Sequence, residues 1–153
     1  MKDLDSIDRS ILRELQKDGR ISNKDLADQV GLSSAPCWQR HRRLENDGVI
    51  EGYSANLNLE KLGFGEIVLL EVQLQSHDKQ SVRAFGAEVA KIPEVLEVYL
   101  TTGGFDYFIK VAVDGTRGYE RFLQERLYQI PGIQNTRSVF TLRCFKRNSS
   151  VSL

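Results

Sequence analysis

The sequence predicts an α+β protein with two folding units, a helical unit followed by a layered unit in the order βαββαβ. Apolar residues recur at helical spacing early in the chain, whereas later segments show strand-like alternation in some stretches and helical spacing in others. The 153 residues are 41% hydrophobic and 27% charged, which excludes disorder and allows a core in one domain or in two small ones. We expect units at residues 1–50 and 66–153, joined by a wing or linker strand at 51–65.

Three helices fit the first unit. Apolar residues recur at helical spacing across residues 5–18, until Gly19 ends the pattern. A second helix begins at residues 22–25, which can form a capping box, and Gly31 suits its left-handed end. The third helix is expected at residues 34–46 after a serine cap. The last two helices are therefore separated by a tight turn.

That tight turn is typical of a helix-turn-helix, in which the final helix reads DNA. A generic three-helix bundle is the alternative interpretation. After Gly48 the period changes to two, and the alternation of Tyr53, Ala55 and Leu57 with polar residues predicts the wing or linker strand. We also expect one helical turn at residues 59–62, before a Gly-Phe-Gly break.

The second unit begins at Glu66 with a strand of alternating apolar residues, followed by an amphipathic helix. Strand-like runs at residues 95–102 and 105–113 flank Gly103 and Gly104, a dipeptide that is typical of hairpin turns. These two runs are therefore expected to pair as antiparallel neighbours.

A second helix ends at Pro131, and a last strand is expected at residues 136–145. The order βαββαβ predicts a split, ferredoxin-like sandwich, in which helices cover one face of a four-stranded antiparallel sheet. The other face of the first strand would carry Ile67, Leu69, Glu71 and Gln73. This mixture is too apolar for open water and too polar for a private core, so we expect an interface between subunits.

The charges balance at 21 Lys and Arg against 21 Asp and Glu, so DNA binding would require a local basic cluster. Residues 33–44 hold three arginines and no acidic residue, a local charge of +3. We therefore expect any contact with double-stranded DNA to concentrate on the third helix.

Several classes of protein are disfavoured by the residue pattern. Cys37 and Cys144 are too sparse for a disulfide framework or a zinc site, and they fit a reducing cytoplasm. The charged N-terminus and short apolar runs predict neither secretion nor a membrane span. No catalytic triad, paired carboxylates or phosphate loop stands out, and the two histidines are His41 and His77. We expect no enzyme, no cofactor and no metal; an enzyme of ferredoxin-like fold is the alternative.

A rotation of 100° per residue sets the faces of the third helix. Cys37, His41 and Leu44 fall on the inward face, and Arg40 lies at its edge, where an internal salt bridge and a phosphate contact are both open. Arginine suits guanine edges or phosphates, glutamine suits adenine, and serines at the helix start suit phosphates. The predicted DNA contacts are Ser33, Ser34, Ala35, Trp38, Gln39, Arg40, Arg42 and Arg43. The alternative is that outward charges merely keep the helix soluble.

Several spaced motifs resemble the Lrp/AsnC (feast/famine) family of transcription regulators along nearly the whole chain. They are Leu4-Asp5-Ser6-Ile7-Asp8, Asp18-Gly19-Arg20-Ile21-Ser22, Val30-Gly31-Leu32-Ser33, Arg43-Leu44-Glu45 followed by Gly48-Val49-Ile50, and Gly103-Gly104-Phe105-Asp106-Tyr107. The resemblance implies a winged helix-turn-helix and a ferredoxin-like domain that dimerises and senses amino acids. It also implies assembly to tetramers or octamers and control of amino-acid metabolism or transport. His41 departs from the aliphatic residue usual there, and we expect it to be partly buried and hydrogen-bonded.

The loop Gly103-x-x-Asp106 matches the effector-loop motif of that family. Glycines let backbone N–H groups approach a ligand carboxylate, and an acid can receive its ammonium group. The resemblance places a free amino-acid effector at Thr102, Gly103, Gly104, Phe105, Asp106 and Tyr107, with Thr136 and Ser138 as further hydroxyl contacts. Set apart from the resemblance, the glycines form a simple hairpin turn and Asp106 is a solvated charge.

The sequence therefore predicts a cytoplasmic, nucleoid-associated transcription regulator that binds specific DNA and an amino acid. The alternative within DNA-binding proteins is an architectural protein that coats the nucleoid with little ligand response. Sequence preference separates the two, because a regulator occupies few sites and an architectural protein coats DNA uniformly.

Overall fold

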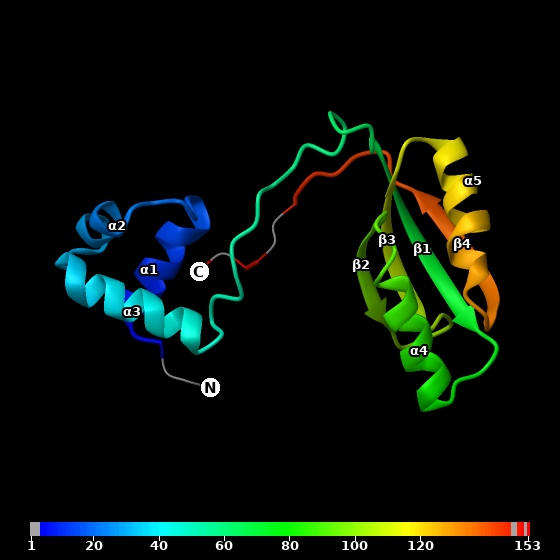
Figure 1. Ribbon diagram of the computed structural model, residues 1–153, viewed down its shortest axis with the longest axis horizontal. Coiled ribbons are helices and arrows are strands. Elements are labelled where there is room, and N and C mark those ends of the chain that lie inside the picture. The colour runs from blue at the N-terminus through cyan, green and yellow to red at the C-terminus, as the bar shows by residue number, and fades with distance from the viewer. Residues whose placement is uncertain (1–3, 148–149, 152) are drawn as a thin grey trace. The chain divides into compact units, whose positions relative to one another are not determined.

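The computed structural model describes residues 4–147, 150, 151 and 153, and the chain forms two compact units (Figure 1). The first unit combines Met1–Asn56 with Lys146–Leu153, and the second is Leu57–Phe145. The domain boundaries expected from the sequence, at residues 50 and 66, differ from these limits and stay predictions of where the two functional domains begin and end. The structure adds that the C-terminal segment belongs with the helical unit: the Gln16 side-chain amide donates to the Val151 carbonyl at 2.6 Å.

The first unit contains the three predicted helices, α1 (Ser6–Lys17), α2 (Asn23–Val30) and α3 (Ser34–Asn46). Gly31 ends α2 in the left-handed region at φ 70°, as expected, because a residue without a Cβ adopts this conformation at low cost. The three helices pack around a shared apolar core. Its buried members are Ile11, Leu12, Leu15, Leu26, Ala27, Cys37 and Leu44.

The capping box lies at a different helix from the one predicted. At α2, the Ser22 hydroxyl accepts the Asp25 N–H at 3.1 Å but donates its own proton to the Asp25 carboxylate at 2.6 Å. The reciprocal box instead begins α1, where the Asp5 carboxylate accepts the Asp8 N–H at 2.8 Å and the Asp8 carboxylate accepts the Asp5 N–H at 3.3 Å. Aspartate can cap as serine does, so the same physical device serves a different helix.

The strand predicted for the linker does not form. Residues 51–58 have no regular secondary structure, and a turn follows in which Phe64 N–H donates to Leu59 O at 2.8 Å. Alternation of side chains creates a strand when a neighbouring segment completes the hydrogen-bond ladder. Among the described residues, no segment pairs with 51–58 in this way. The expected helical turn at 59–62 is present as this hydrogen-bonded turn.

The second unit is the predicted ferredoxin-like sandwich. Its elements are β1 (Glu66–Leu74), α4 (Lys79–Val89), β2 (Val95–Leu100), β3 (Tyr107–Val113), α5 (Thr116–Glu125), a short 3₁₀ helix η1 (Leu127–Gln129) and β4 (Ile133–Phe140). The strands form one antiparallel sheet in the order β2-β3-β1-β4, which α4 and α5 cover (Figure 1). None of the helices in the described part of the chain has the length and apolar character to cross a bilayer.

The two faces of β1 differ as the alternation predicted. Val68, Leu70, Val72 and Leu74 are buried together with Phe85 of α4 and Phe122 of α5. The residues between them, Ile67, Leu69, Glu71 and Gln73, lie on the opposite face and are each partly exposed. The sheet therefore has one face covered by helices and one open face of mixed polarity.

The last strand begins and ends earlier than the sequence suggested. Its first residue, Ile133, pairs with Leu74, and its last, Phe140, pairs with Val68. The strand ends at Phe140, although Thr141 N–H still donates to Ile67 O at 2.9 Å, and the alternating residues at 142–145 form no strand. The strand predicted at 136–145 therefore exists but its predicted limits were wrong, because pairing with β1 decides where it begins and ends.

Candidate functional site

The outward face of α3 is as exposed as the helical rotation predicted. Cys37 and Leu44 are buried in the core, and burial raises the pKa of the Cys37 thiol. The exposed side chains among the predicted contacts are Ser33, Ser34, Ala35, Trp38, Gln39, Arg42 and Arg43. Arg40 is partly exposed. The predicted DNA-contacting side chains are therefore not buried in the core of the first unit.

Arg40 forms the internal salt bridge that the sequence left open. One of its terminal nitrogens lies 2.6 Å from the Asp5 carboxylate and 2.9 Å from the Asp8 carboxylate. Hydrogen bonds to these two carboxylates raise the pKa of the Arg40 guanidinium. The backbone N–H of Asp8 and then the Arg40 side chain lower the pKa of Asp5. Arg40 thus ties α3 to the start of α1.

The other two arginines of α3 are paired as well. Arg43 contacts Asp8 at 2.6 Å, and Arg42 contacts Glu45 on its own helix at 3.0 Å. The Arg42 guanidinium also lies 5.8 Å from the ring centroid of Trp38, in cation–π range. The local charge of +3 counted along the sequence therefore has three acidic partners, two of which come from α1 and were missed because they lie far away in sequence.

The turn between α2 and α3 is held by a side chain that the sequence did not single out. The Asn23 amide donates to the Ser34 carbonyl at 2.9 Å, from the first residue of α2 to the first residue of α3. Ser33 is the N-cap residue of α3, yet its hydroxyl makes no capping hydrogen bond to that helix. The Ser33 hydroxyl is therefore not occupied in capping.

His41 is partly buried and hydrogen-bonded, as predicted. Its Nε2 atom lies 2.6 Å from the hydroxyl oxygen of Tyr53 and 3.5 Å from the Glu45 carboxylate. Burial, and next the nearby Glu45 charge, raise the pKa of Tyr53. Because Glu45 stands beside the imidazole, His41 has an acidic partner on the next turn of the helix.

In the second unit, β2 and β3 pair as the predicted hairpin, but their connection spans residues 101–106 and is longer than the expected Gly103-Gly104 turn, because both strands end short of it. Thr101 N–H donates to Asp106 O at 2.8 Å, and the Thr101 hydroxyl donates to Phe105 O at 2.8 Å. Gly103 adopts φ 123°, a conformation that a side chain would strain. The loop is therefore closed by its own hydrogen bonds, with glycine at the one residue that needs it.

The Asp106 carboxylate is engaged inside the protein. One oxygen accepts the Leu74 N–H at 2.8 Å, and the other lies 3.2 Å from Nε2 of His77. The Asp106 side chain is 16% exposed, whereas that of His77 is 63% exposed. The interpretation of Asp106 as a solvated charge is therefore wrong, because its carboxylate fixes the end of β1 and contacts the exposed His77 side chain.

The neighbours of Asp106 point in different directions. The Tyr107 hydroxyl donates to Val82 O at 2.6 Å within the core, and burial raises the pKa of this phenol. On the open face, the Arg137 guanidinium lies 5.3 Å from the ring centroid of Phe105. Arg137 also forms an ion pair with Glu71 on this face. The loop thus contacts both faces of the sheet.

Thr136 and Ser138 share a face of β4, as predicted, and it is the face covered by helices. They pair with Val72 and Leu70 of β1, which are buried there. The Ser138 hydroxyl lies 2.5 Å from that of Tyr119, and the Thr136 hydroxyl lies 3.3 Å from that of Tyr128. Burial raises the pKa of Tyr119. The sequence analysis missed both tyrosines.

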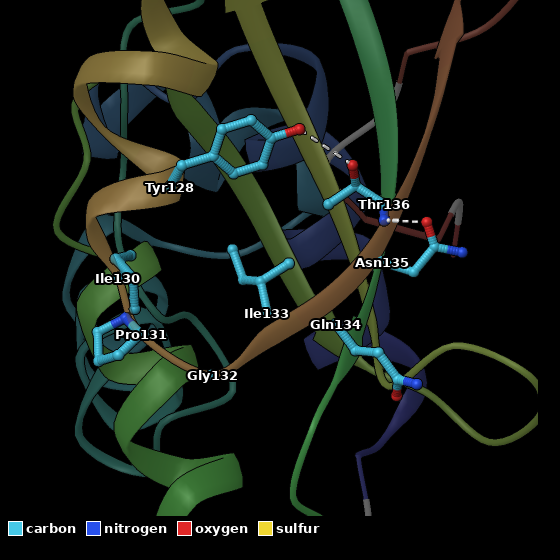
Figure 2. Close-up of a pocket in the computed structure, with 8 residues that line it drawn as sticks. All are labelled: Tyr128, Ile130, Pro131, Gly132, Ile133, Gln134, Asn135 and Thr136. Carbon is cyan, nitrogen blue, oxygen red and sulfur yellow. Dashed lines mark hydrogen bonds between the residues drawn. The ribbon is translucent and has the colours of Figure 1, made fainter.

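A pocket of about 450 Å³ opens beside the start of β4. Figure 2 shows the Tyr128 hydroxyl reaching toward the Thr136 hydroxyl, with the Ile133 side chain below this pair. Its lining residues are Tyr128, Ile130, Pro131, Gly132, Ile133, Gln134, Asn135 and Thr136. Sequence reasoning found one of these, Thr136, because the pocket arises where η1 and β4 meet.

The pocket and the loop 101–106 are linked through the end of β1. Gly132 O at the pocket accepts the Gln75 N–H at 2.8 Å, while the preceding residue, Leu74, donates its N–H to Asp106. The loop 102–107 and Thr136 therefore lie around one end of the sheet, whereas Ser138 pairs with Leu70 near the middle of β1. Within the described ranges, no group of three metal-binding side chains accompanies them.

Comparison with known proteins relates both units to described families. Residues 4–51 match the family described as winged helix-turn-helix DNA-binding, and residues 67–151 match the family described as Lrp/AsnC ligand binding domain. The leucine-responsive regulatory protein of Salmonella typhimurium is 43% identical over 148 residues, which cover 97% of this chain and 90% of that protein. The match therefore extends through both units.

Two solved structures share the arrangement. A transcriptional regulator of Neisseria meningitidis, crystallised as a complex with L-methionine, has a TM-score of 0.91 at 32% identity, covering 97% of this chain and 96% of that chain. The feast or famine regulatory protein of M. tuberculosis, complexed with L-methionine, has a TM-score of 0.87 at 31% identity, covering 99% of this chain and 100% of that chain.

Proposed function

Because the chain belongs to the Lrp/AsnC family, whose members are transcription regulators and not enzymes, we propose how its two units divide the work of regulation. It is a DNA-binding regulator that responds to a ligand. In our proposal α3 reads specific double-stranded DNA, the second unit binds a free amino acid, and the targets are genes of amino-acid metabolism or transport. We place this activity in the cytoplasm, at the nucleoid.

One observation carries the DNA-binding part of the proposal. Trp38, Gln39 and Arg42 stand exposed on the same side of α3, while Cys37 and Leu44 anchor the opposite side in the core. Arginine and glutamine side chains are the usual readers of guanine and adenine edges in the major groove. Ser33 and Ser34 at the start of the helix, and Arg43 farther along, are proposed to contact phosphates.

Selection from a random-sequence duplex pool by the purified protein tests this assignment. A regulator enriches a defined sequence with half-sites about 34 to 36 Å apart, because dimers present two reading helices one helical turn apart. Enrichment of no sequence, with uniform coating of long DNA, favours the architectural alternative. The pool then supplies the specific duplex for affinity measurements.

We propose that the effector binds at the end of the sheet where the loop 102–107 and the pocket beside β4 meet the end of β1. Asp106 is suited to an ammonium group, which would take the place of His77 on its outer carboxylate oxygen. Ile130, Pro131 and Ile133 offer an apolar lining for a side chain, and Thr136 offers a hydroxyl. Leucine and methionine fit this combination, and relatives are named for the one or complexed with the other.

Calorimetry with leucine, methionine and the remaining amino acids tests the effector site in the variant Asp106→Asn. The amide oxygen can still accept the Leu74 N–H, whereas the charge that receives an ammonium is gone. We expect affinity for the effector to fall about tenfold or more, since a hydrogen bond to a charged group is worth about 1.5 to 3 kcal/mol. Asp114→Asn, which removes an exposed carboxylate that pairs with Arg121, is the matched control. Equal affinity in both variants would move the ammonium site elsewhere.

We also propose that the open face of the sheet joins subunits into dimers, from which tetramers or octamers assemble. Leu69 and Val139 are paired neighbours on this face, and Val139 is 49% exposed. The charged pairs Lys110–Glu97 and Arg137–Glu71 surround them, an apolar centre with a polar rim as in many interfaces. Val139→Lys is expected to shift the sedimenting mass toward monomer, whereas Gln124→Lys at an exposed polar position of α5 is the control.

A further inference from the structure

Among the described residues of the first unit, the most deeply buried charge lies behind the proposed DNA surface. Asp8 of α1 is 1% exposed, yet it is an acidic residue in the core. A carboxylate at such a position is costly unless it is paired and hydrogen-bonded. Its partners are the Asp5 N–H at 3.3 Å, Arg40 at 2.9 Å and Arg43 at 2.6 Å. Two of the three come from α3.

Arg40 and Arg43 differ in how much of the guanidinium remains available to bind DNA. The side chain of Arg40 is 29% exposed and holds both Asp5 and Asp8. That of Arg43 is 50% exposed and reaches Asp8 through one terminal nitrogen. A guanidinium carries five N–H donors in a rigid plane, so fixing one edge of Arg43 directs its other donors toward solvent.

We propose that Asp8 is a positioning residue for DNA binding, which holds Arg43, and with Asp5 also Arg40, in the orientation that meets the DNA backbone. The proposal rests on the role of α3 proposed above. Ordering a long side chain before binding removes part of the entropic cost of the contact. The cluster of Asp5, Asp8, Arg40 and Arg43 has no formal net charge, so its contribution is geometry and not long-range attraction. Arg42 differs, because its partner Glu45 lies on the same exposed helix surface.

The positioning role predicts that Asp8 affects how well the protein discriminates between its selected duplex and a scrambled duplex. Asp8→Asn keeps the shape of the side chain but removes the charge that holds the two arginines. Correctly placed phosphate contacts fix the register in which α3 meets the bases, and this register matters only on the selected duplex. Misplaced arginines still attract any duplex, so binding to a scrambled duplex should stay equal or tighten. Binding to the duplex selected by the wild-type protein should weaken about tenfold, the size expected for a contact that involves charged hydrogen bonds.

The experiment compares the affinities of the full-length protein for the selected and scrambled duplexes, well below the unfolding temperature. Asp28→Asn on α2 is the matched control, because it changes the net charge equally at an exposed position. We expect the ratio of the two affinities to fall about tenfold in Asp8→Asn and to stay constant in Asp28→Asn. A purely structural role would lower thermal stability and leave this ratio unchanged, and that result would overturn the proposal.

A double-mutant cycle shows whether Asp8 acts through Arg43. Asp8→Asn should reduce the ratio much less in an Arg43→Ala background than in the wild type. Full additivity would contradict the proposed route. If Asp8→Asn does not fold, Asp5→Asn provides the same test for Arg40, because asparagine caps a helix as well as aspartate does.

Failure of the positioning role can be told from failure of the α3 assignment. If Arg42→Ala and Arg43→Ala both leave DNA affinity unchanged, α3 is not the reading helix and both proposals fall. If those variants weaken binding while Asp8→Asn and Asp5→Asn behave like Asp28→Asn, the reading helix stands and the positioning role is overturned.

Discussion

The ring of Tyr107 lies against the backbone of Gly86, so closely that a Cβ atom at position 86 would stand 2.7 Å from the Tyr107 hydroxyl oxygen. This contact lets the hydroxyl reach Val82 O in α4 and brings the ring within 5.1 Å of the Phe85 ring centroid. Tyr107 directly follows Asp106 in the chain. The absence of a side chain at Gly86 therefore sets how closely the end of the loop 101–106 approaches α4.

Gly86→Ala should lower the free energy of unfolding by about 1 to 2 kcal/mol. Overpacking in a core costs about 1 to 3 kcal/mol, and the better helix propensity of alanine offsets part of that cost. The substitution Tyr107→Phe removes the hydroxyl closest to the new methyl group. Gly86→Ala should therefore lower the free energy of unfolding less in a Tyr107→Phe background than in the wild type. Chemical denaturation of the four proteins measures this coupling, and a stabilising effect of Gly86→Ala would contradict the contact.

Arg42→Ala should weaken binding to the selected duplex by about 1 to 3 kcal/mol if Arg42 reads a base. If Arg42 contacts a phosphate, the loss should be similar for all duplexes, and the salt dependence should fall by about one counterion for each subunit. Fluorescence anisotropy across a range of salt concentrations separates the two. Arg121→Ala on α5, an exposed arginine that pairs with Asp114, is the control and should have no effect.

The single tryptophan should report DNA binding directly. Trp38 is 51% exposed and lies beside the Arg42 guanidinium on the outward face of α3. We expect its emission to change on addition of the selected duplex and to change little with amino acids in the absence of DNA. A strong response to the effector combined with silence toward DNA would show that α3 faces away from the duplex.

The acid sensitivity of the second unit should depend on Asp78, the N-cap of α4. Hydrogen bonds from Ser81 and Ser76 hold the pKa of this carboxylate well below its usual range of about 4. A carboxylate whose pKa is depressed by folding contributes stability above its unfolded pKa and loses it as the pH falls through the folded value. Asp78→Asn keeps the cap but does not titrate, so its stability relative to the wild type should rise as the pH falls below about 4. Urea unfolding monitored from pH 7 to pH 2 measures the difference, and a gap that is independent of pH would rule out the contribution.

Much of the architecture followed from local patterns in the sequence. The limits of α1, α2 and α3, the left-handed end at Gly31 and the two faces of β1 all depend on neighbours within a few residues, and all were confirmed. The wing or linker strand predicted at 51–65 and the limits predicted for the last strand, 136–145, were wrong. A strand needs a partner, and the partner's position is not written in the alternation of the strand itself.

The candidate site shows the same division. The sequence identified the exposed side of α3 and the loop around Asp106, because helical rotation and a glycine turn are local properties. It did not identify Asp8 as the partner of Arg40 and Arg43, which lie 32 and 35 residues away along the chain. Nor did it identify the pocket formed where η1 meets β4, or the tyrosines that face Thr136 and Ser138.

The sequence by itself determined which segments become helices, which sides of α3 and β1 turn inward and which family the motifs resemble. The tertiary structure decided which charges neutralise one another and where a cavity opens. The physical reason is range: periodicity and capping act through hydrogen bonds and side chains a few residues apart, whereas ion pairs and pockets depend on elements that meet after the chain has packed. In the sequence the arginines of α3 therefore form an unpaired basic cluster, whereas in the folded protein each of them forms an ion pair with an acidic side chain.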